Sequence, residues 1–140
     1  LLARAVGGSV FSGARPEIGL SDITLTPAGM ADPHLGTFPR AWSLIQWHGQ
    51  GVEVPESCTV LAGSEAFPVQ AFRVGQRAYG LLFHLELDRE ALEILCRECP
   101  EDVAASGRPA QTLVAEALPH LPVLHRLAEQ FLGGLLAGSR

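Results

Sequence analysis

Charged residues are scarce in this 140-residue sequence: they make up 18%, with 10 basic against 15 acidic side chains. The net charge of -5 leaves no basic surface for a phosphate backbone, so nucleic acid is not an expected partner. An apolar run of 18 residues is also missing, so we expect neither a membrane-spanning helix nor a membrane partner. The 47% hydrophobic content, in contrast, is ample for the core of one domain.

Cysteine is sparse too. Cys58, Cys96 and Cys99 are an odd number without the spacing of a disulfide framework, which predicts a reducing, cytoplasmic setting. No signal peptide is visible. The first residue is Leu1 rather than Met, so we expect that a segment upstream was removed or never included.

Strand-like segments fill residues 9–86. The chain up to residue 8 reads as the tail of a helix, Leu1 to Val6, which Gly7 and Gly8 end. The strands expected after it cover residues 9–11, 18–26 with a bulge near Ser21-Asp22, 41–47, 58–62, 70–74 and 78–86. A turn is expected at residues 12–16, a loop at 48–51, and a hairpin connection at 74–77.

Helical patterns follow from Asp88 onward. Asp88 can cap a helix over residues 89–99, which Pro100 would end. Residues 101–109 are polar and read as a linker, and residues 110–118 and 123–137 carry apolar stripes at helical spacing. No internal repeat is present.

His84 and Glu86 lie at the end of the apolar run that starts at Ala78. Residues two apart on a strand point the same way, so the carboxylate can reach the imidazole while Leu85 faces the other layer. A carboxylate on one ring nitrogen fixes the tautomer and raises the basicity of the other nitrogen, as a general base requires. Such a pair is also common on solvated strands, so spacing alone does not distinguish the two interpretations.

Four stretches, read in series, carry a family resemblance. They are Leu1-Leu2-Ala3-Arg4-Ala5-Val6-Gly7-Gly8, Arg15-Pro16-Glu17-Ile18-Gly19, Gln46-Trp47-His48-Gly49, and Ser64 to Arg73 running on to Tyr79-Gly80-Leu81-Leu82-Phe83-His84-Leu85-Glu86. In this order they resemble the later half of a class I glutamine amidotransferase domain, closest to stand-alone glutaminases similar to the amidotransferase part of GMP synthase.

The resemblance implies an α/β, flavodoxin-like fold that is incomplete here, without its N-terminal strands and nucleophile elbow. Residues 1–140 would form a partial domain, with strands, loops and the His/Glu site in 1–87 and C-terminal helices in 88–140. Parallel strands of this fold class are covered on both faces. Loss of the first strands would expose apolar sheet, so we expect self-association or a partner, either the missing half or a synthetase that receives ammonia.

The resemblance also implies a Cys-His-Glu triad that hydrolyses the side-chain amide of L-glutamine and releases ammonia, without a cofactor or a metal. His84 would take the thiol proton and Glu86 would orient His84. Family members carry the thiol in a Gly-x-Cys-x-Gly-x-Gln turn before the helix whose tail opens this chain. The nucleophile is therefore expected just upstream of Leu1, and the chain alone is expected to be inactive.

The three cysteines present are poor substitutes. Cys58 has no glycine elbow, and Cys96 and Cys99 come late in a helix, away from the N-terminal end that would lower a thiol pKa. Their Cys-x-x-Cys spacing is also found in redox and zinc sites, but no second ligand pair accompanies it. We expect Cys96 and Cys99 to pack structurally.

By the resemblance, the backbone around Trp47, His48 and Gly49 would line the glutamine pocket. Gly49 permits close approach of a ligand, although an ordinary turn glycine is an equal alternative. The family usually has Asp where Gln50 stands and Pro where Leu85 stands. Gln50 puts any charge-based contact at that position in doubt, whereas Leu85 keeps the strand alternation and should be tolerated.

Two other functions remain open at this point. One is a regulatory or interaction module that keeps the fold without the chemistry, which the absent nucleophile and Gln50 favour. The other is a related hydrolase with the same triad, such as a γ-glutamyl peptidase.

Overall fold

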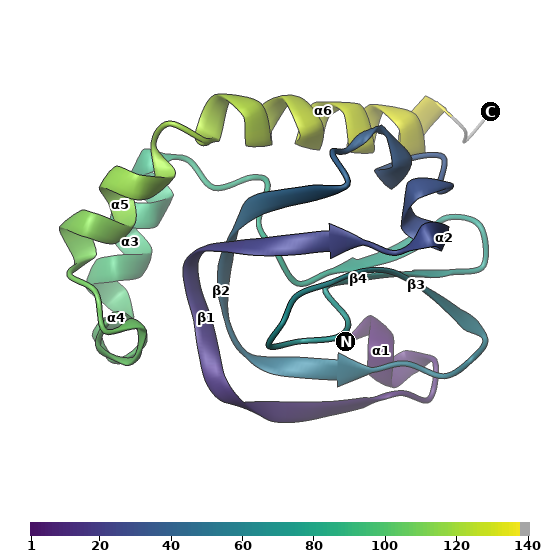
Figure 1. Cartoon of the computed structure of the whole chain (residues 1–140), viewed down its shortest axis with the longest axis horizontal. Coiled ribbons are helices and arrows are strands. Elements are labelled where there is room, and N and C mark those ends of the chain that lie inside the picture. Colours follow the sequence, from purple (N-terminus) through teal and green to yellow (C-terminus); the bar gives the residue numbers. More distant parts are fainter. Residues whose placement is uncertain (138–140) are drawn as a thin grey trace.

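The computed structural model describes residues 1–137, which form one sheet flanked by helices (Figure 1). Its strands are β1 (Ser9–Leu25), β2 (Ala41–Glu53), β3 (Cys58–Gly63), β4 (Ala71–Val74) and β5 (Ala78–Leu81). Its helices are α1 (Leu2–Ala5), α2 (Pro27–Met30), the 3-10 turn η1 (Leu35–Thr37), α3 (Arg89–Glu98), α4 (Pro100–Ser106), α5 (Ala110–Ala117) and α6 (Leu121–Ala137).

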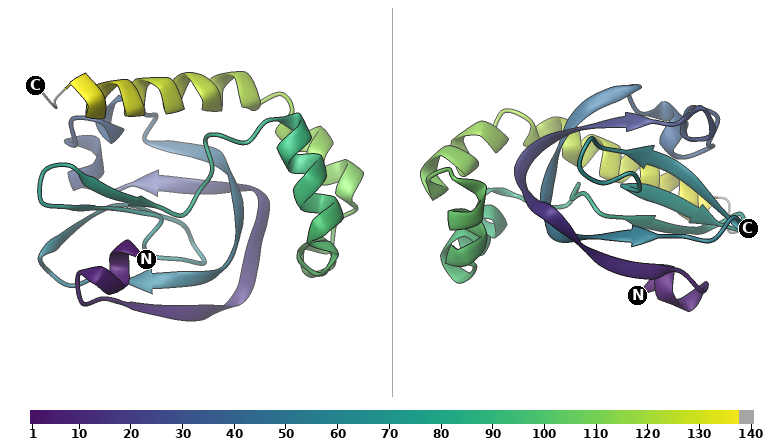
Figure 2. Two further views of the ribbon diagram at one scale, coloured as in Figure 1. Left: turned by 180° about the vertical axis from the view of Figure 1, so that it is seen from behind. Right: turned by 60° about the horizontal axis from the view of Figure 1, so that its bottom comes forward.

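The sheet has the order β2-β1-β3-β4-β5, and its two ends approach each other. An isolated antiparallel bridge joins Ile45 of β2 to His84, just beyond β5. The sheet therefore curls, and Figures 1 and 2 show β1 and β2 bending around the other strands. Every pairing among residues 1–137 is antiparallel, so the parallel strands that are typical of the fold class do not occur in this part of the chain.

β1 is one long strand, where the sequence predicted two strands and a turn. The register irregularity lies between Ser12 and Glu17, and Ser21 pairs regularly with Leu44, so the bulge predicted near Ser21 is wrong. Pro16 has no N–H to give to a ladder, which accounts for an interruption at this point. The strand continues past Pro16 because β1 pairs with β2 both before and after this interruption.

β2 likewise continues through residues 48–51, where a loop was predicted. Gly51 explains the continuation: a Cβ there would come within 2.6 Å of the rings of Phe11 and Phe67. Glycine at residue 51 thus leaves room for aromatic side chains that pack over the strand. The prediction of a loop treated this glycine as a turn signal and did not include its role in packing.

The observed helices agree more closely than the strands with what the sequence predicted. Oδ1 of Asp88 accepts a hydrogen bond from the N–H of Ala91 at 2.8 Å, which confirms the predicted cap of α3. The predicted linker at residues 101–109 is wrong over most of its length because α4 occupies it. Pro100 ends α3 and also opens α4, since proline fits the first helical position.

The helices cover two sides of the sheet. α6 runs along one side, while α3, α4 and α5 gather where β1 and β2 bend (Figure 2). The larger of two hydrophobic core clusters joins both halves of the chain, and it includes Ile45, Phe83, Leu113, Leu124 and Phe131. None of the helices in the described part of the chain has the length and hydrophobicity to span a bilayer.

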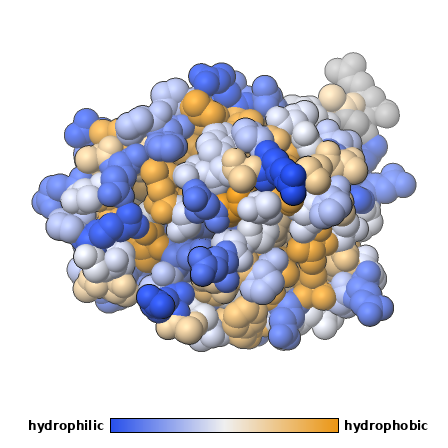
Figure 3. Space-filling model, viewed as in Figure 1, coloured by the Kyte–Doolittle hydropathy of each residue, from blue (hydrophilic) through white to orange (hydrophobic). Residues whose placement is uncertain are grey.

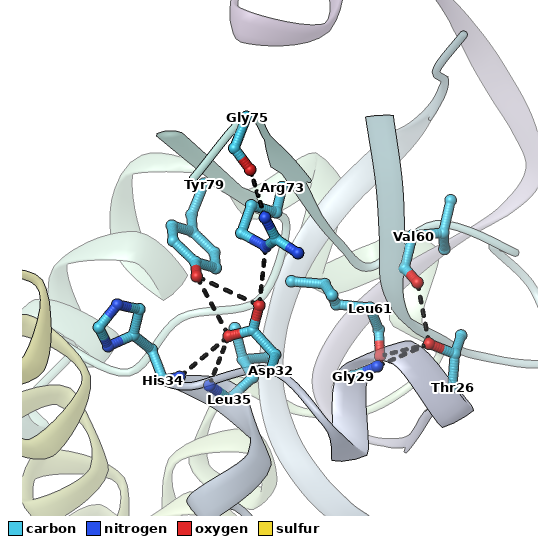
Figure 4. Close-up of polar contacts among 10 residues, drawn as sticks. All are labelled: Thr26, Gly29, Asp32, His34, Leu35, Val60, Leu61, Arg73, Gly75 and Tyr79. Carbon is cyan, nitrogen blue, oxygen red and sulfur yellow. Dashed lines mark hydrogen bonds and ion pairs between the residues drawn. The ribbon is translucent and has the colours of Figure 1, made fainter. Parts of the chain in front are cut away.

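Asp32 is a buried carboxylate that ties the loop after α2 to the β4-β5 hairpin (Figure 4). It accepts hydrogen bonds from the backbone N–H groups of His34 and Leu35, from Nε of Arg73 at 2.9 Å, and from the Tyr79 hydroxyl at 3.1 Å. Burial, reinforced by the Asp32 charge, raises the pKa of Tyr79 to about 12. These contacts hold the hairpin that leads to His84.

Candidate active site

His84 lies three residues beyond the end of β5, where the backbone bends. The strand predicted over 78–86 is therefore too long. The backbone N–H of His84 donates to the carbonyl of Ile45 at 2.8 Å, which anchors this segment against β2. The residues before and after His84 also anchor the segment, because the side chains of Phe83 and Leu85 are buried in the core.

The predicted contact between His84 and Glu86 is confirmed. Nδ1 of His84 lies 2.7 Å from Oε1 of Glu86, and Oε2 of Glu86 accepts a hydrogen bond from the N–H of Leu85 at 2.9 Å. The carboxylate therefore selects the tautomer with its proton on Nδ1 and leaves a lone pair on Nε2. That arrangement suits a base that acts through Nε2.

The environment of Glu86 keeps its carboxyl group ionised. Burial raises its pKa, but the hydrogen bonds from His84 and from the backbone outweigh that effect, and the net result is a lowered pKa. At neutral pH the ring of His84 therefore faces an ionised carboxylate. Glu86 also borders an apolar hollow of about 230 Å³, which lies between residues 81–85 and α6.

α6 fixes the other end of this segment. Nε2 of His125 lies 3.0 Å from the carbonyl oxygen of Leu87 and can donate a hydrogen bond to it. The His/Glu pair is thus held between β2 on one side and α6 on the other. Sequence analysis gave His125 no role, because its partner is a backbone atom 38 residues away.

Trp47, His48 and Gly49 are consecutive residues of β2. The indole N–H of Trp47 donates to Asp102 of α4 at 2.9 Å, so this side chain anchors a helix. Gly49 would tolerate a Cβ within the chain, because the nearest atom, on Pro16, would be 3.5 Å away. It also lies in a strand, so the alternative of a turn glycine is wrong.

His48 is surrounded by polar groups. Its Nε2 lies 3.0 Å from Oε1 of Gln46 and 3.5 Å from Oε2 of Glu17, and its Nδ1 lies 3.0 Å from the carbonyl oxygen of Gln50. Burial lowers the pKa of His48 and the charge of His84 lowers it further, while the Gln50 carbonyl and Glu17 oppose this shift. The structure therefore brings His48 within electrostatic reach of His84.

No role was predicted from the sequence for Glu17, Gln46 or Gln70. Gln46 and Gln70 are fully buried, which is unusual for amide side chains. The available signal was the set of motifs itself, since each of these residues belongs to one of the stretches that carry the family resemblance.

The cysteines do not resemble a nucleophile. Cys58 and Cys96 are buried. Burial and the neighbouring Glu93 raise the pKa of the Cys96 thiol, and desolvation and nearby carboxylates raise that of Cys99. High pKa values oppose thiolate formation. Among residues 1–137, no group of three or more His, Cys, Asp or Glu side chains could hold a metal ion.

Fold and site together define an α/β domain with a curled antiparallel sheet and a His–Glu pair beyond its last strand. No family model matches the sequence. The chain is 34% identical over 117 residues to a glutamine amidotransferase-like protein, YfeJ, of Salmonella typhimurium, covering 83% of this chain and 49% of that protein. It is also 34% identical over 102 residues to γ-glutamyl peptidase 5 of Arabidopsis thaliana, covering 69% and 41%.

Solved structures agree. A glutamine amidotransferase of Thermotoga maritima superposes with a TM-score of 0.83 and 25% identity, over 96% of this chain and 57% of that one. A glutamine amidotransferase of Methylobacillus flagellatus shares the fold with a TM-score of 0.86. The chain belongs to the class I glutamine amidotransferase-like domains, as its motifs indicated. It spans about half the length of the curated relatives it matches.

Proposed function

We propose that this chain supplies the histidine and glutamate of a Cys-His-Glu triad that hydrolyses the side-chain amide of L-glutamine and releases ammonia. The observation that carries the proposal is the 2.7 Å contact between Nδ1 of His84 and Oε1 of Glu86. Nε2 of His84 has no hydrogen-bond partner within residues 1–137, so it is available to a substrate or a nucleophile.

The nucleophile in this proposal is a cysteine from a Gly-x-Cys-x-Gly-x-Gln turn, upstream of residue 1, in a longer class I domain of which residues 1–140 are a part. Nε2 of His84 takes the thiol proton, and the thiolate attacks the amide carbon of glutamine. Backbone N–H groups stabilise the oxyanion. His84 then gives the proton to the departing ammonia and activates the water that hydrolyses the thioester to glutamate.

The substrate pocket in this proposal uses the backbone of Trp47, His48 and Gly49. Gly49 supports it, because neither its backbone conformation nor its packing within the chain requires the absence of a Cβ. Gly49 also has no partner residue on β1, since the regular pairing ends at Glu17 and His48 and resumes at Ser12 and Gln50. The missing ladder partner supports contact between the Gly49 backbone and a ligand.

The test is to join the chain to an upstream segment that carries the Gly-x-Cys-x-Gly-x-Gln turn and to measure glutamine-dependent ammonia release. We expect activity in the joined protein, none in residues 1–140 alone, and none in the joined His84→Asn variant. His120→Asn, a change in the turn before α6, is the matched control and should leave the rate unchanged. Ammonia release by residues 1–140 after replacement of all three cysteines would refute the proposal.

A γ-glutamyl peptidase is the second candidate, favoured by the similarity to γ-glutamyl peptidase 5. It would use the same triad but release a peptide or amine in place of ammonia. Offering the joined protein glutamine and a γ-glutamyl dipeptide separates the two, because a peptidase cleaves the dipeptide faster. Either enzyme would work in the cytoplasm, the setting in which the three unpaired cysteines stay reduced.

A further inference from the structure

Glu17 belongs to a family motif, yet the proposed function gives it no task. Its side chain is only 11% exposed. Oε2 accepts a hydrogen bond from Nε2 of Gln70 at 2.5 Å, and the same Nε2 donates to Oγ of Ser64 at 3.1 Å. Because Gln70 is fully buried, these bonds hold the Glu17 carboxylate at a fixed point beside β2.

The group that Glu17 faces is the imidazole of His48. Both ring nitrogens of His48 meet an acceptor, Oε1 of Gln46 and the carbonyl of Gln50, each at 3.0 Å. A neutral imidazole has only one N–H, so it cannot donate to both. Either His48 is protonated, or the Gln46 amide makes a half-turn and donates its Nε2–H, which as it stands has no partner within residues 1–137.

The surroundings of His48 act on the balance between these two arrangements. Burial, and to a smaller extent the charge of His84, disfavours the imidazolium, whereas the Gln50 carbonyl, the Glu17 charge and the Gln70 side chain favour it. Among these groups Glu17 is the charged side chain that favours a proton on His48. A change of charge at Glu17 should therefore alter both the protonation of His48 and the hydrogen bonds that orient its ring.

His48 in turn lies where the β1-β2 ladder is interrupted. Glu17 and His48 are the last regular pair before the gap, and Gly49 stands opposite the unpaired residues of β1. Fewer ladder bonds constrain the backbone there, so side-chain contacts determine its position. Phe67, fully buried, packs edge-on against the His48 ring with centroids 4.7 Å apart and closes the cluster.

We propose that Glu17 is a positioning residue: through His48 it fixes the strand edge at Trp47–Gly49 that would bind glutamine. The substrate part of this inference rests on the proposed function. The placement of the strand edge does not, and it can be measured on residues 1–140 alone.

The first experiment is NMR on the 140-residue chain. Glu17→Gln should lower the midpoint of the His48 titration and shift the backbone amides of Trp47, His48 and Gly49. Glu65→Gln, which removes the same charge from an exposed neighbouring loop, should do neither. If Glu17→Gln does not fold, Glu17→Asp, which withdraws the carboxylate by one methylene, should move the same amides. An unchanged titration and unchanged amides in a folded variant would overturn the inference.

The second experiment uses the joined protein. Glu17→Gln should raise KM for glutamine at least about fivefold and leave kcat within about twofold, the signature of lost binding that leaves the chemistry intact. An unchanged KM would contradict the inference, as would an equal loss of kcat. If the joined wild type releases no ammonia, the proposed function fails, and the NMR result alone then decides whether Glu17 positions the strand edge.

Discussion

The backbone N–H of His84 donates to the carbonyl of Ile45, so the segment that carries the His/Glu pair is joined to β2. His48 lies three residues along the same strand, and the charge of His84 already acts on its pKa. One bridge between distant parts of the sequence therefore places both groups of candidate residues at one edge of the sheet.

Glu86 should matter for rate more than for binding. In the joined protein we expect Glu86→Gln to lower kcat about 10²-fold, because the imidazole loses the carboxylate that sets its tautomer, with little change in KM. Ammonia release under saturating glutamine measures kcat, and a series of glutamine concentrations measures KM. A large rise in KM with normal kcat would contradict the assignment.

The same carboxylate should make stability depend on pH in acid. The pKa of Glu86 is lowered from 4.5 on folding, so its contribution is present above that value and disappears as the pH falls through the folded pKa. The advantage of wild type over Glu86→Gln in urea unfolding should therefore shrink below pH 4.5. It should be small, because the Glu86 side chain is 66% exposed. A constant difference across this range would contradict the pairing.

Tyr79 offers a test at the other end of the pH scale. It is the sequence's single tyrosine, so ultraviolet titration of tyrosinate reports on it alone. We expect a midpoint near 12, where an unfolded chain gives about 10. Because folding raises the pKa of Tyr79, the contribution of this hydroxyl to stability is complete below the unfolded pKa. That contribution disappears as the pH rises through about 12.

Tyr79→Phe should cost about 1 kcal/mol of unfolding free energy, since Asp32 keeps its other partners. Asp32→Asn should cost more, because it removes the charge that pairs with Arg73. Urea unfolding at neutral pH measures both variants. Equal costs would mean that Asp32 does not organise this network.

α4 depends on one contact that sequence analysis did not foresee. Asp102→Ala removes the acceptor of the Trp47 indole and should cost about 1 kcal/mol. Glu101→Ala, which removes an equal charge from the same first turn, is the matched control and should cost less. Thermal unfolding followed by tryptophan fluorescence compares the two.

Residues 1–140 should self-associate. Figure 3 shows hydrophobic patches among the polar residues of one face, and α6 exposes Leu132 and Leu136 by 55% and 73%. Replacing both with glutamate should shift the chain toward monomer in sedimentation velocity, whereas Gln130→Glu, on an exposed polar position of the same helix, should not. A wild-type monomer at all concentrations would contradict this expectation.

Local chemistry in the sequence accounts for what was predicted correctly. The helix cap at Asp88, the hairpin turn at Gly75 and the contact between His84 and Glu86 all join residues close in sequence. The errors concern long-range relations. Gly51 and Pro16 predicted breaks in β2 and β1. Both strands nevertheless continue, because β1 and β2 pair with each other along most of their length.

The sequence by itself determined the family, the helices near Asp88 and the His/Glu pair, because motifs, caps and alternation depend on residues a few positions apart. Only the tertiary structure decided that the strands are antiparallel and that Glu17, Gln70 and His48 meet. The physical reason is that buried amides and carboxylates are stable only beside specific partners, and the folding of distant strands brings those partners together.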